Sequence, residues 1–335
     1  MREVPGGRTG ARVAVQKIII DCDPGIDDAL ALVFAHGHPE LELRGITTVA
    51  GNVGLGQTTA NALRVRDFVG MRDVPVTAGC PVPLQRPALH ARQVHGDSGL
   101  GAASLPAASS GPADGHAVDF LADAAGAEPG RVTLIAIGPL TNIALALRRH
   151  PQLVSQAGDF VIMGGSAGRG NVTPAAEFNI AADPEAAAIV FGAGWTVTMV
   201  GLDVTLQARA TAAVRARMRG LGRLADDLLL PSLAGYRNVG RRPGSEHADG
   251  PAVHDICAVA RVAAPGLITC VPARVEVETA GRWTSGMTVT DFTAAAGDCN
   301  AQVAVAIDTD GFWDLVLDAY ARVAAGLGAA SVTPR

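Results

Sequence analysis

Short apolar runs alternate with Ala- and Leu-rich segments of helical length from residue 17 onward, and this alternation restricts the fold more than any other feature. The runs are rich in β-branched residues and end near Gly, Asp or Pro, as strands do. Continuous apolar runs of this length are typical of strands buried on both faces of a parallel sheet. We expect such strands at residues 17–20, 43–49, 131–137, 159–163 and 196–200.

The segments between these runs predict helices at residues 27–35, 58–69, 115–125, 140–147 and 184–191, and two more at 253–263 and 314–325. Alternation of this kind predicts one α/β domain over residues 17–330, with an open, mostly parallel, Rossmann-like sheet covered by helices on both sides. Residues 274–291 and 301–307 alternate with a period of two and predict further strands at the sheet edge. Residues 1–16 are expected to be a disordered tail.

Composition and charge exclude several classes of protein. Apolar residues make up 48% of the chain and charged residues 18%, so the chain can bury a large core. The 27 basic and 32 acidic side chains give a net charge of −5 without a basic block, so we expect no nucleic-acid partner. No apolar run approaches the roughly 18 residues of a membrane span. Five scattered cysteines without a CxxC pair exclude a disulfide framework and a zinc site, and indicate a cytoplasmic location.

Four carboxylates stand within eight residues, DCDPGIDD at 21–28, directly after the first predicted strand. Two ionised carboxylates about 4 Å apart repel by about 4 kcal/mol at an effective dielectric constant of about 20, so this cluster needs a cation or shifted pKa values. Oxygen ligands without a Cys or His pair favour Ca²⁺ or Mg²⁺, and several carboxylates suit Ca²⁺ better. Because strand carboxyl ends bind ligands in α/β sheets, we interpret the cluster as an ion site.

Two other interpretations of this cluster compete. Asp residues that cap a helix N-terminus would explain one or two of the four carboxylates. Phosphatases of the haloacid-dehalogenase type also place Asp-x-Asp after an apolar strand, but their site usually adds a downstream lysine. The only lysine of this chain is Lys17, which precedes the cluster, so the phosphatase interpretation is weaker.

The cluster resembles the opening signature of the inosine-uridine nucleoside hydrolase family, DCDPG-x-DDA-x-A, which reads DCDPGIDDALAL here. Further segments resemble the family in the same order along nearly the whole chain: TTVAGN, VHGDSGL, AIGPLTNIA, VIMGG, GNVTPAAEFNIAADPEAA, MVGLDVT and HDICAVA. The resemblance implies hydrolysis of the N-glycosidic bond of ribonucleosides to ribose and free base, with a bound Ca²⁺ and an oxocarbenium-like transition state. It also implies a role in nucleoside catabolism and salvage.

The resemblance assigns roles residue by residue. The implied Ca²⁺ ligands are Asp23, Asp28, the backbone carbonyl of Ile137, and Asp255. Asp23 would also be the general base on a calcium-bound water, and His254 the acid for the departing base. The implied substrate-binding residues are Asp27 and Asn179 at the ribose hydroxyls, Asn171 and Glu177 at the 5′ side, Asn52 and Met163 near the sugar, His95 beside the base, and Phe178.

Base preference and assembly are less constrained by these motifs. The loop at residues 235–251, before the HD pair, offers Tyr236 and several arginines where relatives carry more aromatic residues. A broad or inosine- and uridine-leaning specificity is our first expectation, and a pyrimidine-restricted enzyme the second. A ribose- or nucleoside-binding protein without activity is the alternative of another class, but it would not need Asp23, Asn179 and His254 together. The family resemblance implies a homodimer or homotetramer.

Overall fold

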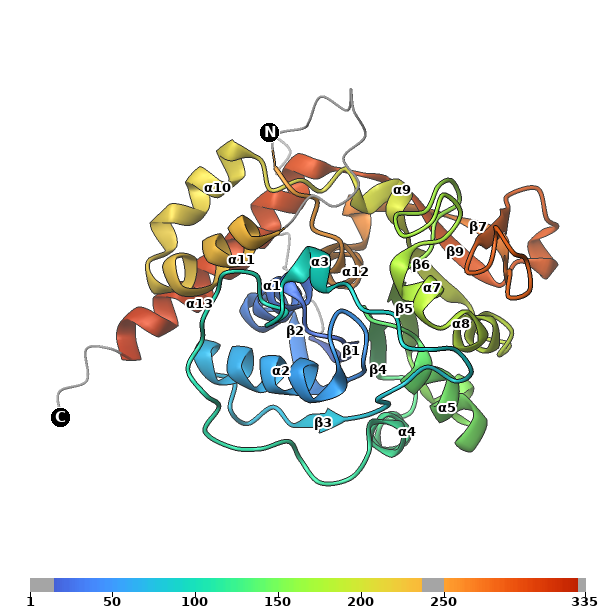
Figure 1. The fold of residues 1–335 in the computed structure, drawn as a ribbon, viewed down its shortest axis with the longest axis horizontal. Helices are drawn as coiled ribbons and strands as arrows, with labels where there is room; N and C mark the ends of the chain where they lie inside the picture. Colours follow the sequence, from blue (N-terminus) through green and yellow to red (C-terminus); the bar gives the residue numbers. More distant parts are fainter. Residues whose placement is uncertain (1–14, 237–249, 331–335) are drawn as a thin grey trace, which may run out of the picture.

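One sheet organises the molecule (Figure 1). The computed structural model describes residues 15–236 and 250–330, and within them nine strands run in the order β3-β2-β1-β4-β5-β6-β9-β7-β8. Neighbouring strands from β3 to β9 are parallel, whereas β7 pairs antiparallel with both β9 and β8. The strands are β1 Gln16–Cys22, β2 Leu41–Thr48, β3 Val76–Ala78, β4 Val132–Ala136, β5 Asp159–Met163, β6 Val197–Val200, β7 Ile268–Val277, β8 Thr288–Asp291 and β9 Ala301–Ile307.

Helices cover both faces of the sheet because its central strands are apolar on both sides. In β1, Ile18 and Ile20 belong to one apolar core and Ile19 to the other. The first core includes residues of α1, α2, α12 and α13, and the second includes residues of α4, α5 and α8. The helices are α1 Ile26–Gly37, α2 Leu55–Val69, α3 Arg92–His95, α4 Ala117–Ala127, α5 Thr141–Arg149, α6 Leu153–Gln156, α7 Phe178–Ala182, α8 Pro184–Phe191, α9 Leu202–Thr205, α10 Ala212–Met218, α11 Leu230–Gly235, α12 Asp255–Ala263 and α13 Thr309–Ala330, with a π-helical turn at Ala225–Leu229 and 3₁₀ turns at Arg219–Leu221, Pro265–Leu267 and Ala296–Asp298.

Helix boundaries follow local chemistry. Asp183 caps α8 by accepting a hydrogen bond from the backbone N–H of Ala186, and Pro184 stands at the first helical position. Helix α2 ends at Gly70, whose φ of 88° is in the left-handed region that glycine adopts without strain. These signals explain why boundaries read from the sequence lie close to the observed ones.

The predicted α/β class and parallel sheet are confirmed. The predictions for 159–163 and 184–191 coincide with β5 and α8, and the other predicted helices and strands lie within a few residues of observed ones. The placement of 301–307 at the sheet edge was wrong, because β9 lies between β6 and β7. The three-residue strand β3 was not predicted. Of the expected tail, residues 1–14 lie outside the described residues, and β1 begins at Gln16.

The strand order determines where a ligand can bind. The order in which strands are added to the sheet reverses between β1 and β4. From β1 the chain adds β2 and β3 on one side, and from β4 it adds β5 and β6 on the other. Ligands of open α/β sheets bind in the crevice at the carboxyl ends of such strands. Residues 21–28 follow β1 and Ile137 follows β4, so both belong to this crevice.

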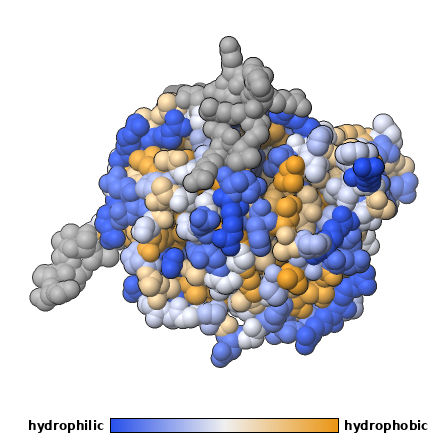
Figure 2. Space-filling model, in the orientation of Figure 1, coloured by the Kyte–Doolittle hydropathy of each residue, from blue (hydrophilic) through white to orange (hydrophobic). Residues whose placement is uncertain are grey.

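The surface shows mixed polarity. On the face drawn in Figure 2, hydrophilic residues surround smaller apolar areas. Among the described helices, none is long and apolar enough to cross a membrane.

Candidate active site

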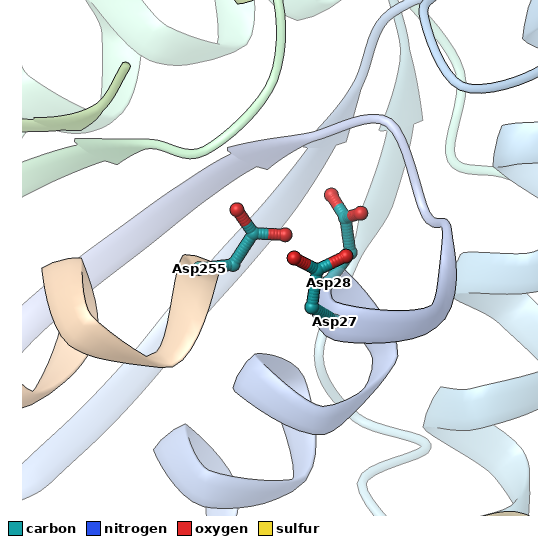
Figure 3. Close-up of side chains that lie close together, drawn as sticks. All are labelled: Asp27, Asp28 and Asp255. Carbon is teal, nitrogen blue, oxygen red and sulfur yellow. The ribbon is translucent and has the colours of Figure 1, made fainter. Parts of the chain in front are cut away.

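Three carboxylates from two distant parts of the chain meet at the crevice. Asp27 and Asp28 lie in the first turn of α1, and Asp255 is the first residue of α12, which packs against α1. Figure 3 shows the three side chains facing one another, and their ligand oxygens lie within 4.8 Å of each other. All three residues are buried. A group of this kind can hold a cation.

Asp23 lies fully buried next to this group. Its Oδ2 accepts a hydrogen bond from the backbone N–H of Asn52 at 2.6 Å, and its own N–H donates to Oδ1 of Asp28 at 3.1 Å. Its Oδ1 is buried and has no hydrogen-bond partner among the described residues. A buried carboxylate oxygen without a donor is costly, so this atom indicates a missing polar or cationic partner.

Burial gives these carboxylates unusual proton affinities. Loss of solvent, followed by repulsion from Asp27, raises the pKa of Asp28 to about 6. Burial, and then the charge of Asp28, holds the pKa of Asp23 well above its ordinary value, and burial together with Asp27 does the same for the pKa of Asp255. A hard cation would reverse these shifts, because opposite charge favours the ionised form. The carboxylates and the unpartnered Oδ1 therefore fit a divalent ion with oxygen ligands.

A cavity of about 360 Å³ opens beside the carboxylates. Asp23 and Asp28 are not part of its lining and belong to the buried group behind it. The structure brings the remaining predicted site residues together around this cavity: Asp27, Asn52, His95, Ile137, Met163, Asn171, Glu177, Phe178, Asn179, His254 and Asp255. The sequence motifs thus converge on one cavity, although their individual roles remain predictions.

Helix α7 presents amide and carboxylate groups to one wall. Asn179 is buried, and its Nδ2 donates to the carbonyl oxygens of Ile137 and Met163, both at 3.0 Å. A carbonyl oxygen has two lone pairs, so this bond leaves Ile137 able to take a second partner. Glu177 caps α7 by accepting from the N–H groups of Asn179 and Ile180, and it also accepts from Gly165. These bonds fix both side chains before any ligand binds.

Two histidines line another part of the cavity. The Nδ1 of His95 accepts a hydrogen bond from the N–H of Ile26 at 3.1 Å, which leaves Nε2 as the protonated nitrogen of the neutral ring. Burial lowers the pKa of His95. His254 shares a 2.8 Å hydrogen bond through Nδ1 with the hydroxyl of Thr205, and its backbone N–H donates to Oδ2 of Asp27. The fold therefore fixes both rings.

Several lining residues were not predicted as site residues. They include Gln93, Leu206, Arg209 and Ala252, whereas Tyr236 was noted only as the aromatic residue of its loop. None stands in a family-like motif that points to chemistry. Arg209 and Ala252 reach the cavity because residues 208–210 pair with 251–253, a contact between distant segments. The expected loop at 235–251 lies mostly outside the described residues.

Comparison with known proteins agrees with this geometry. The family model described as inosine-uridine preferring nucleoside hydrolase matches residues 18–314. The inosine-uridine preferring nucleoside hydrolase of Leishmania major is 47% identical over 92% of this chain and 98% of its own length. The pyrimidine-specific ribonucleoside hydrolase RihA of Salmonella schwarzengrund is 43% identical over 90% and 97%.

Solved structures give the same result. The purine-preferring ribonucleoside hydrolase from Gardnerella vaginalis superposes with a TM-score of 0.85 at 34% identity, and the match covers 92% of this chain and 99% of that one. The chain therefore belongs to the inosine-uridine preferring nucleoside hydrolase family and is an N-glycosyl hydrolase of ribonucleosides.

Proposed function

We propose that this enzyme releases ribose and free base from ribonucleosides in a Ca²⁺-dependent reaction whose general base is Asp23. The observation that carries the proposal is the buried carboxylate group beside the cavity, in which Oδ1 of Asp23 has no partner among the described residues. An oxygen-only ligand set of this charge favours a hard dication, and Ca²⁺ accepts more oxygen ligands than Mg²⁺.

The ion would be held by Asp23, Asp28, Asp255 and the carbonyl oxygen of Ile137. When bound, such an ion binds hydroxyl groups of the sugar and lowers the pKa of a water molecule. Asp27 lies within 4.8 Å of Asp28 and Asp255, so its carboxylate can contact either the ion or a ribose hydroxyl. We assign it to the ribose, as the family resemblance implies, and its side chain lines the cavity where the sugar would lie.

The cavity wall around the sugar carries negative charge. Positive charge develops on the ribose as the glycosidic bond breaks, so carboxylates there bind the transition state more tightly than the substrate. Asp27 and Glu177 contribute this charge, and Asn179 adds an amide oxygen. Asp23 takes a proton from the attacking water, a contribution of about 10²–10⁴ in rate.

His254 is our candidate for protonating or hydrogen-bonding the departing base. It lines the cavity, and Thr205 and Asp27 hold it in place. For base preference we propose a broad or inosine- and uridine-leaning specificity. The relatives of this chain carry names that state an inosine-uridine, a pyrimidine or a purine preference. The alternative of a pyrimidine-restricted enzyme is therefore supported by one of these three kinds of relative.

The decisive experiment is a reducing-sugar assay on inosine, uridine, cytidine and adenosine with added Ca²⁺. Release of ribose from at least one nucleoside is expected, and no release from any of the four would support a binding protein instead. The ratio of rates determines the base preference.

Two substitutions test the assigned roles. Asp23→Asn should abolish turnover and weaken calcium retention, and His254→Ala should slow purine substrates by about tenfold or more while ribose affinity changes little. The matched control is Asp226→Asn, which alters an exposed carboxylate outside the cavity. Near-normal turnover in Asp23→Asn would exclude this carboxylate as the base.

A further inference from the structure

One cationic side chain, Arg209, lines the cavity among the described residues. It follows α9 and precedes α10, outside the segments that resemble the family. The other lining residues that carry a formal charge are Asp27, Glu177 and Asp255, all of them carboxylates. A permanent cation in a cavity whose other formally charged side chains are all carboxylates needs an explanation.

Backbone pairing places Arg209 on the same wall as His254. Arg209 forms an antiparallel bridge with Ala252, and this bridge is supported by hydrogen bonds from Ala210 to Pro251 and from Val253 to Ala208, both 2.9 Å. Directly opposed residues of such a pair point to the same side, and so does the residue two positions further along. Arg209, Ala252 and His254 therefore share one side of the pair, and all three line the cavity.

Most donors of the guanidinium group have no partner in the described part of the chain. Arginine carries five N–H donors, and Nη1 donates to the carbonyl oxygen of Gly250 at 3.0 Å. Within residues 15–236 and 250–330 its side chain makes no other hydrogen bond, and no carboxylate lies within ion-pair distance of it. One bond thus anchors the group, and its remaining donors have no partner among residues 15–236 and 250–330.

The distribution of charge matches the reaction. Carboxylates stand where the sugar gains positive charge, whereas Arg209 stands beside His254, our candidate contact of the base. The bridge from Arg209 to Ala252 and the shared lining of the cavity place Arg209 and His254 on the same wall. Electrons move into the base as the bond breaks, so a cation there stabilises the leaving group.

We propose that Arg209 is a specificity-determining residue whose guanidinium donates hydrogen bonds to a carbonyl oxygen of the base and stabilises its departure. Hypoxanthine, guanine and uracil carry such an oxygen, whereas adenine presents an amino group at position 6. Arginine has no acceptor for an amino donor, so its N–H groups would remain unpaired opposite the 6-amino group of adenine. This inference rests on the proposed hydrolysis and narrows its substrates to nucleosides of oxo bases.

The test compares inosine with adenosine, which share the ribose and the purine ring but carry an oxo and an amino group, respectively, at position 6, with a proton on N1 only in inosine. We expect wild type to have a higher kcat/KM for inosine than for adenosine. Arg209→Gln should lower kcat/KM for inosine by about 10- to 100-fold and change kcat/KM for adenosine by less than about threefold. Arg209→Lys, which keeps a charge and a donor for Gly250, should restore part of the loss. Arg219→Gln, an exposed arginine of the following segment, is the matched control.

A riboside with a nitrophenyl leaving group separates a role at the base from a structural role. Nitrophenolate needs little stabilisation, so its release should change less than about threefold in Arg209→Gln. An unchanged inosine-to-adenosine ratio in Arg209→Gln, or an equal loss on the nitrophenyl riboside, would overturn the proposal. No hydrolysis by wild type would instead refute the proposed function, so the two failures are distinguishable.

Discussion

At the scale of single residues, the site depends on glycines that let the backbone approach Asp23. A Cβ placed on Gly51 would lie 2.0 Å from Oδ2 of Asp23, and one on Gly138 would lie 2.7 Å from Oδ1. Both distances are below any real contact, so a side chain at either position must displace the carboxylate. The position of the proposed base therefore depends on the absence of neighbouring side chains.

Gly51→Ala should lower kcat by about a hundredfold or more, because a displacement of about 1 Å can have that effect on a catalytic group. The control is Gly54→Ala, whose added methyl group meets nothing within 4 Å at a φ of −66° that any residue adopts. Steady-state kinetics on the best nucleoside substrate measure both variants. Activity of Gly51→Ala within threefold of wild type would contradict this account.

Glu177 should make stability depend on pH. Burial raises its pKa to about 7 although three backbone N–H groups donate to it. The folded state therefore binds more protons than the unfolded state between the two pKa values, and stability decreases as pH rises through this range. Its stabilising contribution is complete only below the ordinary pKa of a glutamate.

The measurement is urea unfolding of wild type and Glu177→Gln at about pH 5 and about pH 8. The free energy of unfolding of wild type minus that of Glu177→Gln should be smaller at the higher pH. Glu185→Gln is the control, because the hydrogen bond from Arg86 lowers the pKa of Glu185 and keeps it ionised throughout. An advantage of wild type over Glu177→Gln that grows with pH would contradict the assignment.

The sequence predicted the central residues of the site but not all of its walls. Asp23 and Asp28 stand in the acidic cluster after the first strand, and the resemblance of the motifs to the family selected them together with His254 and Asp255. Arg209 stands in no motif, and its place in the cavity depends on a bridge to Ala252 that neither periodicity nor spacing encodes. Long-range backbone pairing is the part of the site that a single sequence does not specify.

At the scale of elements, close contacts hold the first helix, α1, against the last, α13. Gly37, the last residue of α1, lies against α13, where an added Cβ would come within 2.2 Å of the carbonyl oxygen of Ala319. Tyr320 of α13 donates from its hydroxyl to the carbonyl oxygen of Leu30 at 3.1 Å. Helix α13 is thus fixed to the helix that carries Asp27 and Asp28.

The same chemical change should have opposite effects at two glycines. Gly37→Ala should lower the free energy of unfolding by about 1–3 kcal/mol, because the packed helices must separate. Gly326→Ala, at an exposed position of α13 with nothing within 4 Å, should raise it by about 0.5–1 kcal/mol through helix propensity. Urea denaturation measures both changes, and the same sign for both would contradict the packing described here.

Element prediction succeeded where periodicity was strong and failed where an element was short or its neighbours were distant. Strand β5 and helix α8 were predicted with their observed bounds. The three residues of β3 are too few to produce a periodic signal. The alternation in residues 301–307 indicated a strand but not its neighbours, so its interior place between β6 and β7 followed only from the fold.

At the scale of the whole molecule, the carboxylate group joins the beginning of the fold to its last third. Asp27 and Asp28 belong to α1 and Asp255 to α12, and burial of these charges opposes folding unless a cation offsets them. Ion binding to the folded state alone stabilises it by about 2.7 kcal/mol at a hundredfold excess over the dissociation constant. The ion is therefore expected to support stability as well as catalysis.

Removal of divalent ions with a chelator should lower the melting temperature and abolish ribose release, and added Ca²⁺ should restore both. Mg²⁺ should restore less, since it prefers fewer ligands in a stricter geometry. Asp255→Asn should show a much smaller calcium-dependent change in melting temperature. Differential scanning calorimetry provides this measurement, and a melting temperature insensitive to chelation in wild type would contradict the ion site.

The separation in sequence between Asp27 and His254, which lie side by side at the cavity, has a consequence for biosynthesis. His254 and Asp27, which share a hydrogen bond, are 227 positions apart. At translation rates of about 5–20 residues per second, His254 is synthesised roughly 10 to 45 s after Asp27. A ribosome-bound chain that stops before α12 would carry Asp27 and Asp28 without His254 and Asp255, so we expect neither ion binding nor nucleoside hydrolysis until α12 has been made.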